Sequence, residues 1–138
     1  RKLVKNKIAV MGHLGILPHT DKKFTFKGKK SLERNRILKE AKLLEEAGIF
    51  SIVLECIEIK LSKVITNKLT IPTIGIGSSA NCDGQVLVID DLIGLSESKF
   101  RFVKKYVNMS KIINGAVRQY KLEVLRKQFP KSKHSFKN

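Results

Sequence analysis

Phe50-Ser51-Ile52-Val53-Leu54-Glu55-Cys56 is the stretch that decides the fold, because an apolar run there closes on a carboxylate. A segment with helical spacing precedes it and ends at Gly48. The stretch therefore predicts a buried strand of a parallel sheet, with Glu55 at the carboxyl end of the strand. Ligands bind at that end in α/β folds, because the crossover helices cover the faces of the sheet. Position alone leaves two interpretations of Glu55 open: a structural ion-pair partner, or a working acid or base.

The same succession of strand, loop and helix recurs along the chain. Apolar segments at residues 7–12, 72–77 and 85–91 predict three further strands, and helical spacing at residues 32–47 and 59–69 predicts the helices between them. Strands that alternate with helices indicate right-handed crossovers and a parallel sheet. Residues 97–128 are predicted to be mostly helical and basic, and residues 129–138 to form a polar, mobile tail.

His13 follows the first predicted strand, in a segment punctuated by Gly12, Gly15 and Pro18 that predicts a loop. It would then lie at a strand's carboxyl end, as Glu55 does. A lone histidine more often serves packing or hydrogen bonding than catalysis, and both roles remain open. Residues 20–30 are polar and basic, and they predict an extended loop or a short hairpin arm.

Length and composition indicate one compact domain. The chain has 138 residues, of which 42% are hydrophobic, as is ordinary for a globular core. Its apolar runs are too short to cross a bilayer, and it opens with no signal-like segment, so we expect a cytoplasmic protein. The chain begins at Arg1, close to the first predicted strand, and we expect further sequence upstream.

The formal net charge of +16 is spread unevenly. Residues 1–42 carry 13 basic against 3 acidic side chains, residues 43–98 carry 3 against 8, and residues 99–138 carry 12 against 1. Clustered lysines gain affinity for nucleic acid by releasing counterions from phosphates, so a basic nucleic-acid-binding module is an alternative function. Most lysines fall on predicted helices between aliphatic residues, which favours a solvated basic face, and nucleic acid is not expected as a partner.

One glycine-rich motif suggests a nucleotide. Gly75-Ile76-Gly77-Ser78-Ser79-Ala80 fits the dinucleotide pattern GxGxxG/A and follows a predicted strand. Such a site needs a helix at once, whose amino terminus binds the pyrophosphate. Residues 81–84 instead predict a turn, and another apolar segment begins at Gln85, so no dinucleotide is expected. The glycines are expected to let a ligand or a neighbouring strand come close.

Two sets of side chains bear on metal binding. Cys56 and Cys82 stand 26 residues apart without a CxxC motif, which predicts reduced thiols and neither a zinc site nor a disulfide scaffold. Asp83, Asp90 and Asp91 carry oxygens that metals bind. Aspartates in turns and at strand ends more often cap helices, which favours a structural role for all three.

Four segments share their order and spacing with a known enzyme family. They are Gly12-His13-Leu14-Gly15, Ile52-Val53-Leu54-Glu55-Cys56, Ile71-Pro72-Thr73-Ile74-Gly75-Ile76-Gly77 and Cys82-Asp83-Gly84-Gln85-Val86-Leu87-Val88. Together they resemble ketopantoate hydroxymethyltransferases, also called 3-methyl-2-oxobutanoate hydroxymethyltransferases, which catalyse the first committed step of pantothenate and coenzyme A synthesis. Residues 116–120 and 129–136 look like the carboxyl-terminal region of that family, so the resemblance covers essentially the whole chain.

The resemblance implies an α/β fold of the (β/α)8 TIM-barrel type, in a protein about twice as long as this chain. The chain would be the second half of that barrel, roughly strands five to eight, followed by a helical basic region. Residues 1–128 would form the half-barrel domain and residues 129–138 the tail. A decameric homo-oligomer is also implied.

The implied reaction is hydroxymethyl transfer from 5,10-methylenetetrahydrofolate to 3-methyl-2-oxobutanoate, a 2-oxo acid, giving 2-dehydropantoate. In the family, Mg2+ binds the oxo acid and stabilises the enolate that forms when C3 loses a proton. A carboxylate general base must reach that proton, and the glutamate of the family's Leu-Glu-Cys motif, which has that role, falls on Glu55. His13 matches a histidine at the family's substrate site and is carried over as a supporting polar contact.

The sequence also departs from the family pattern. Leu17-Pro18-His19 stands where the family has Thr-Pro-Gln, and residues 24–29 replace a stretch like Tyr-Lys-Val-Gln-Gly-Arg with a shorter and more basic one. No residue here matches the family's magnesium ligands, which belong to the first four strands. The chain is therefore expected to carry the general base without the metal site and to have little activity alone. A non-catalytic half-barrel that pairs with a complete paralogue is a further alternative.

Overall fold

The computed structural model describes residues 1–17 and 25–136. These residues fall into two compact units, Arg1–Leu87 and Val88–Asn138, and each is described by itself. Part of the predicted loop arm, residues 20–24, and the last two residues of the predicted tail lie outside the described residues.

The first unit is built on a four-stranded parallel sheet, which confirms the predicted sheet type. Its strands are β1 (Met11–Gly15), β2 (Ser51–Glu55), β3 (Thr73–Ile76) and β4 (Gly84–Gln85). They lie side by side in chain order, so each crossover moves the chain on by one strand in the same direction. In the register of β1 and β2, His13 pairs with Val53 and Gly15 with Glu55.

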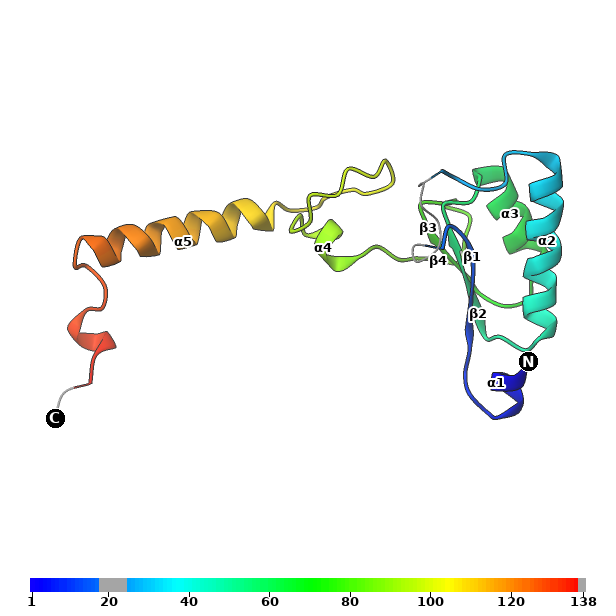
Figure 1. Ribbon diagram of the computed structural model, residues 1–138, viewed down its shortest axis with the longest axis horizontal. Coiled ribbons are helices and arrows are strands. Elements are labelled where there is room, and N and C mark those ends of the chain that lie inside the picture. Colours follow the sequence, from blue (N-terminus) through cyan, green and yellow to red (C-terminus); the bar gives the residue numbers. More distant parts are fainter. Residues whose placement is uncertain (18–24, 137–138) are drawn as a thin grey trace. The chain divides into compact units, whose positions relative to one another are not determined.

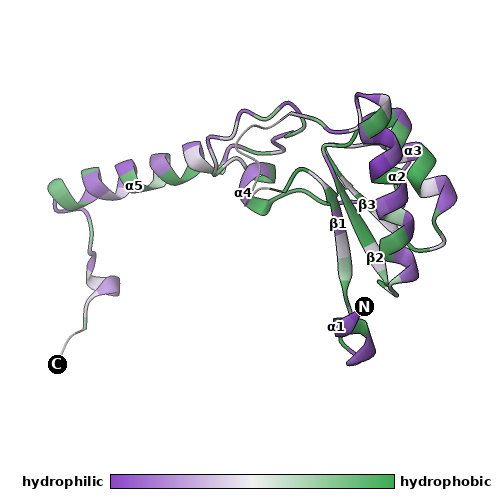
Figure 2. Ribbon diagram, turned by 45° about the vertical axis from the view of Figure 1, so that its right-hand side comes forward, coloured by the Kyte–Doolittle hydropathy of each residue, from purple (hydrophilic) through white to green (hydrophobic). Residues whose placement is uncertain are grey.

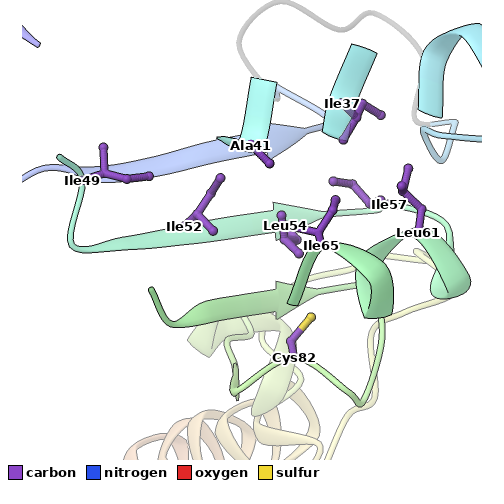
Figure 3. Close-up of a cluster of buried hydrophobic side chains, with 9 residues drawn as sticks. All are labelled: Ile37, Ala41, Ile49, Ile52, Leu54, Ile57, Leu61, Ile65 and Cys82. Atoms are coloured by element: carbon purple, nitrogen blue, oxygen red, sulfur yellow. The ribbon is translucent and has the colours of Figure 1, made fainter. Parts of the chain in front are cut away.

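Two helices cover one face of this sheet (Figure 1). They are α2 (Ser31–Glu46) and α3 (Ile59–Lys68), and a short helix α1 (Lys2–Lys5) precedes β1. Isoleucine, leucine and alanine side chains from α2, α3 and β2 meet in one buried cluster (Figure 3). The cluster consists of Ile37, Ala41, Ile49, Ile52, Leu54, Ile57, Leu61, Ile65 and Cys82. The helices are therefore held by apolar burial against a single face of the sheet.

The other face of the sheet carries the residues of functional interest. Side chains alternate between the faces along a strand, and Ile52 and Leu54 point into the cluster under the helices. Val53 and Glu55 must then lie on the opposite face, and His13 joins them because it pairs with Val53. The face that α2 and α3 leave uncovered is thus the one that holds His13 and Glu55.

The first strand begins later than its apolar run predicted. Residues 7–10 precede β1, and residues 13–15, predicted as a loop, form the last three positions of the strand. Pairing with β2 outweighs the two glycines as strand breakers, because both are needed there for space. A Cβ at Gly12 would lie 2.6 Å from Ile49, and one at Gly15 would lie 1.9 Å from the carbonyl oxygen of Glu55.

The fourth strand is much shorter than predicted. Only Gly84–Gln85 pairs with β3, and the predicted strand's end instead forms a short helix, α4 (Ile89–Leu92). The preceding strand β3 offers four residues, and the last bond of the ladder runs from the amide of Val86 to the carbonyl of Gly75. Asp90 and Asp91 lie in the first turn of α4, where negative charge is favourable.

The second unit is mainly one amphipathic helix. Helix α5 (Met109–Leu125) is bounded at its start by Asn108, whose side chain accepts a hydrogen bond from the amide of Lys111. Hydrophilic and hydrophobic residues alternate along α5 (Figure 2), and a 3-10 helix (Ser132–His134) follows in the predicted tail. Within the described parts of the chain, no helix is both long and apolar enough to cross a membrane.

Candidate active site

Glu55 is the last residue of β2, as its sequence position predicted. The residue is only 8% exposed, although a carboxylate ordinarily stays in water. It is followed by Cys56, whose φ of +51° turns the chain sharply out of the strand. The carboxylate is therefore held at the carboxyl end of a buried parallel strand, on the face that the helices leave open.

His13 lies beside Glu55 across the gap between β1 and β2. Its Nε2 atom is 3.2 Å from Oε2 of Glu55, and the exposed fractions of the two side chains are 36% and 10%. Among the described residues, His13 is the one polar partner of the Glu55 side chain. The structure thus brings together the two residues that the sequence pointed to.

The charge of Glu55 affects the pKa of the next residue, Cys56. Burial and, as the smaller cause, the adjacent Glu55 carboxylate together raise the pKa of the Cys56 thiol to about 11. A thiolate is the reactive form of cysteine, so Cys56 is held neutral and unreactive at physiological pH. Its place next to Glu55 is structural, because its backbone makes the turn that ends β2.

Ser78, just after β3, bonds to both sides of the Glu55-Cys56 pair. Its hydroxyl donates to the carbonyl oxygen of Leu54 at 2.8 Å and accepts from the amide of Ile57 at 3.0 Å. Sequence reasoning treated Ser78 only as part of a small-residue motif. A hydroxyl one or two residues past a parallel strand is the signal that could have singled it out, because neighbouring strands end at the same edge of the sheet.

Two further hydrogen bonds join the chain after β1 to the turn after Glu55. The amide of Lys27 donates to the carbonyl oxygen of Cys56 at 2.8 Å, and the amide of Glu58 donates to the carbonyl oxygen of Lys27 at 2.9 Å. Backbone pairings of this kind leave no side-chain pattern in the sequence. The prediction of an extended segment at residues 20–30 came nearest to finding them.

The aspartates that sequence analysis weighed as metal ligands have structural partners. Asp83 accepts hydrogen bonds from the amide and the hydroxyl of Thr73, at 2.8 and 2.9 Å, and these bonds lower the pKa of its carboxyl. Asp91 accepts one from the hydroxyl of Ser96. Within residues 1–17 and 25–136, no three histidine, cysteine, aspartate or glutamate side chains gather closely enough to hold a metal ion.

The glycine motif after β3 serves close packing. A Cβ at Gly75 would lie 2.8 Å from the side-chain nitrogen of Gln85 on β4, which agrees with the expected approach of a neighbouring strand. The side-chain Nε2 of Gln85 donates to the carbonyl oxygen of Ser79 at 2.8 Å, and the chain enters β4 where a dinucleotide site would need a helix.

This arrangement suits proton transfer at carbon. A carboxylate with low exposure can accept a proton from a ligand held at the open face of the sheet. The imidazole of His13 can hold one oxygen in place, and its own exposure leaves it in reach of the same ligand. Neither role requires any movement of the two strands.

Comparison with known proteins gives one consistent family. The sequence profile of the ketopantoate hydroxymethyltransferase family matches residues 1–132. The 3-methyl-2-oxobutanoate hydroxymethyltransferase of Pelagibacter ubique is 58% identical over 136 residues, covering 99% of this chain and 53% of the relative. Those of Syntrophus aciditrophicus and Clostridioides difficile are 48% and 43% identical, covering 99% and 97% of this chain and 52% and 50% of the relatives. The chain spans about half the length of the curated relatives that it matches.

Proposed function

The chain belongs to the ketopantoate hydroxymethyltransferase family, and from that premise we propose that it supplies the general base, Glu55, for a hydroxymethyl transfer. The proposed reaction moves a one-carbon unit from 5,10-methylenetetrahydrofolate to 3-methyl-2-oxobutanoate and gives 2-dehydropantoate. The observation that carries the proposal is the pairing of a buried Glu55 with His13 at the carboxyl end of two parallel strands. Catalytic groups of parallel α/β enzymes gather at that end.

We propose that the first unit is part of a (β/α)8 barrel. Its strands follow one another in chain order, and α2 and α3 lie on one face only. An open doubly wound sheet would instead reverse its strand order and carry helices on both faces. In a barrel, the uncovered face that holds His13 and Glu55 becomes the interior, and the strands' carboxyl ends surround the substrate. That residues 1–128 form one half-barrel domain, with residues 129–138 as a tail, is part of this proposal.

In the proposed reaction, the Glu55 carboxylate removes the proton from C3 of the oxo acid. The C3–H bond breaks, its electron pair becomes the enolate, and the proton stays on Oε1 or Oε2 of Glu55. C3 then forms a bond to the one-carbon group as the two bonds from that carbon to N5 and N10 of the folate break. Water supplies the new hydroxyl, and its other hydrogen and the proton taken from C3 end on the two folate nitrogens, so tetrahydrofolate leaves. His13, whose Nε2 lies 3.2 Å from Oε2 of Glu55, pairs with that oxygen and so orients the carboxylate for the first step.

The Mg2+ implied by the family resemblance has no set of ligands among the described residues. No step here depends on this ion. The folate-binding residues and the proposed decameric assembly also rest on family resemblance alone.

The test is to replace Glu55 and measure hydroxymethyl transfer. The protein assayed should carry this chain together with any sequence that its gene encodes on either side. Glu55→Gln keeps the shape but cannot accept the proton, and we expect it to lower kcat by about 10²–10⁴-fold. Glu40→Gln on α2, which removes a surface ion pair with Arg36, is the matched control and should keep its turnover. Normal turnover by Glu55→Gln would remove Glu55 as the base.

A further inference from the structure

The turn that follows Glu55 is made by a residue in an unfavourable conformation. Cys56 has a φ of +51°, in the left-handed region that residues other than glycine rarely adopt. Such a conformation persists only where the surroundings determine it fully. Here the amide of Cys56 donates to the carbonyl of Ile76 at 2.8 Å, and its carbonyl accepts from the amide of Lys27 at 2.8 Å. The orientation of Glu55 at the end of β2 therefore depends on the hydrogen bond between Cys56 and Lys27.

The backbone around Lys27 is held by hydrogen bonds to residues at the amino-terminal ends of two helices, α2 and α3. Its carbonyl accepts from the amide of Glu58, and the next amide, that of Gly28, donates to the carboxylate of Glu33 in the first turn of α2 at 2.8 Å. Glu58 is the N-cap of α3, and its carboxylate also pairs with Arg34 of α2 at 2.8 Å. We call Lys27, Gly28, Glu33 and Glu58 the 27–28 anchor.

Gly28 is the residue of the anchor that no other amino acid can replace. Its φ is +85°, and a Cβ there would lie 2.4 Å from Cδ2 of Leu61. Leu61 is fully buried in the core cluster, so it has no room to withdraw. The backbone reaches Cys56 only because position 28 carries no side chain.

We infer that the 27–28 anchor is a positioning device for Glu55, with Gly28 and Glu33 as positioning residues that set the direction of the carboxylate through the Cys56 turn. The inference rests on the proposed function, because it gives a catalytic meaning to contacts that do not touch the substrate. Proton transfer needs the base within hydrogen-bond reach of the C3 proton, so small rotations of the turn reduce the rate.

The test compares two glycines with similar positive φ, although the Cβ contact would be closer at Gly28 (2.4 Å) than at Gly48 (3.0 Å). Gly28→Ala breaks the anchor, whereas Gly48→Ala, at a φ of +89° after α2, imposes similar strain at the other end of β2. We expect Gly28→Ala to lower kcat by about 10–100-fold, as a displacement near 1 Å can, with little change in KM for the oxo acid. Gly48→Ala should keep kcat near the wild-type value. Equal effects of the two variants on kcat would overturn the inference.

A second pair keeps the test decisive if Gly28→Ala fails to fold. Glu33→Ala removes the acceptor for the Gly28 amide, Glu33→Gln keeps an oxygen acceptor there, and Glu40→Ala on the same helix is the control. We expect kcat to fall by about 10-fold in Glu33→Ala, because a bond to a charged acceptor is lost, and to recover in Glu33→Gln. Wild-type kcat in Glu33→Ala would contradict the inference.

A readout independent of catalysis separates this inference from the proposed function. The thiol of Cys56 is 7% exposed, and its alkylation can be followed by mass-spectrometric peptide mapping, which distinguishes it from Cys82. Gly28→Ala and Glu33→Ala should alkylate faster at Cys56 than the wild type, while Gly48→Ala should not. An unchanged alkylation rate in both anchor variants would overturn the inference alone. An inactive wild-type protein would overturn the proposed function, and the catalytic meaning of the anchor with it.

Discussion

The Nε2 atom of His13 lies 3.2 Å from Oε2 of Glu55, although 41 residues lie between them in the sequence. His13 belongs to β1, which ends at Gly15, and Glu55 ends β2, which begins at Ser51. The contact follows from strand register, because His13 pairs with Val53, and Val53 shares a face with Glu55. A parallel sheet is what makes such a contact possible, since it brings the carboxyl ends of successive strands to one edge.

Removal of the imidazole should weaken the base without abolishing it. We expect His13→Ala to lower kcat by about 10-fold or more, because Glu55 loses the polar contact that holds its carboxylate in place. Met11→Ala, two residues earlier on the same strand face, is the control. The measurement is steady-state turnover at saturating oxo acid. Equal rates for His13→Ala and Met11→Ala would show that the imidazole does not orient Glu55.

The Cys56 thiol should report the charge of Glu55. Burial and the Glu55 carboxylate raise its pKa to about 11, from an ordinary value of 9.0. Glu55→Gln removes the charge but leaves the burial, so the thiol pKa should fall and yet stay above 9.0. The pH dependence of alkylation at Cys56 measures this pKa. A pKa unaffected by Glu55→Gln would mean that the carboxylate does not face the thiol as the structure shows.

Glu45 should make stability depend on acid pH. Its carboxylate accepts from Lys42 Nζ at 2.6 Å and from the amide and hydroxyl of Thr70 at 2.6 and 2.8 Å, which lowers its pKa to about 2 from 4.5. A pKa lowered by folding stabilises the folded state above pH 4.5, and that stabilisation is lost as the pH falls towards 2. Glu45→Gln should therefore lower the melting temperature at pH 7, with the deficit shrinking below pH 4.5.

The neighbouring Glu46 provides the control for that measurement. Glu46→Gln changes the same charge one position along α2, and among the described residues its side chain has no hydrogen-bond partner to lose. Thermal unfolding from pH 7 to pH 2.5 compares the three proteins. A deficit for Glu45→Gln that stays constant over this range, or equals that of Glu46→Gln, would contradict the assignment.

This chain on its own should associate. Strands β1 and β4 are the edges of the four-stranded sheet, and the face without helices leaves Met11 47% exposed. Unpaired parallel edges and an uncovered apolar face favour pairing with another chain. Sedimentation velocity at micromolar concentration should show dimers or larger species. A monomer that melts in one cooperative transition would contradict the half-barrel proposal.

Local patterns predicted most of the first unit, because the spacing of apolar residues along the sequence indicates which segments are buried strands and which are helices. The run that ends at Glu55 gave β2, and the apolar spacing before Gly48 gave α2 nearly to its observed bounds. The extension of β1 to Gly15 was missed, because Gly15 looks like a strand breaker until the Glu55 carbonyl is known to lie against it. Tertiary pairing decided that boundary, and no local signal carries it.

The site was predicted by its residue types and not by its supporting contacts. Position and resemblance pointed to Glu55 and His13, and the structure places them side by side. The hydroxyl of Ser78 and the backbone of Lys27 were not predicted, because their partners are main-chain atoms of residues 54–58, far away in the sequence. Bonds to backbone impose no partner residue type, so sequence reasoning had no pair to find.

Exchange of the C3 hydrogen of 3-methyl-2-oxobutanoate in deuterium oxide, without folate, tests the role of Glu55 most directly. Proton removal is then isolated from one-carbon transfer, and proton NMR follows the loss of the C3 signal. The wild-type protein should catalyse exchange, and Glu55→Gln should slow it by about 10²-fold or more, while Glu40→Gln exchanges normally. Exchange at the wild-type rate in Glu55→Gln would contradict the claim that Glu55 is the base.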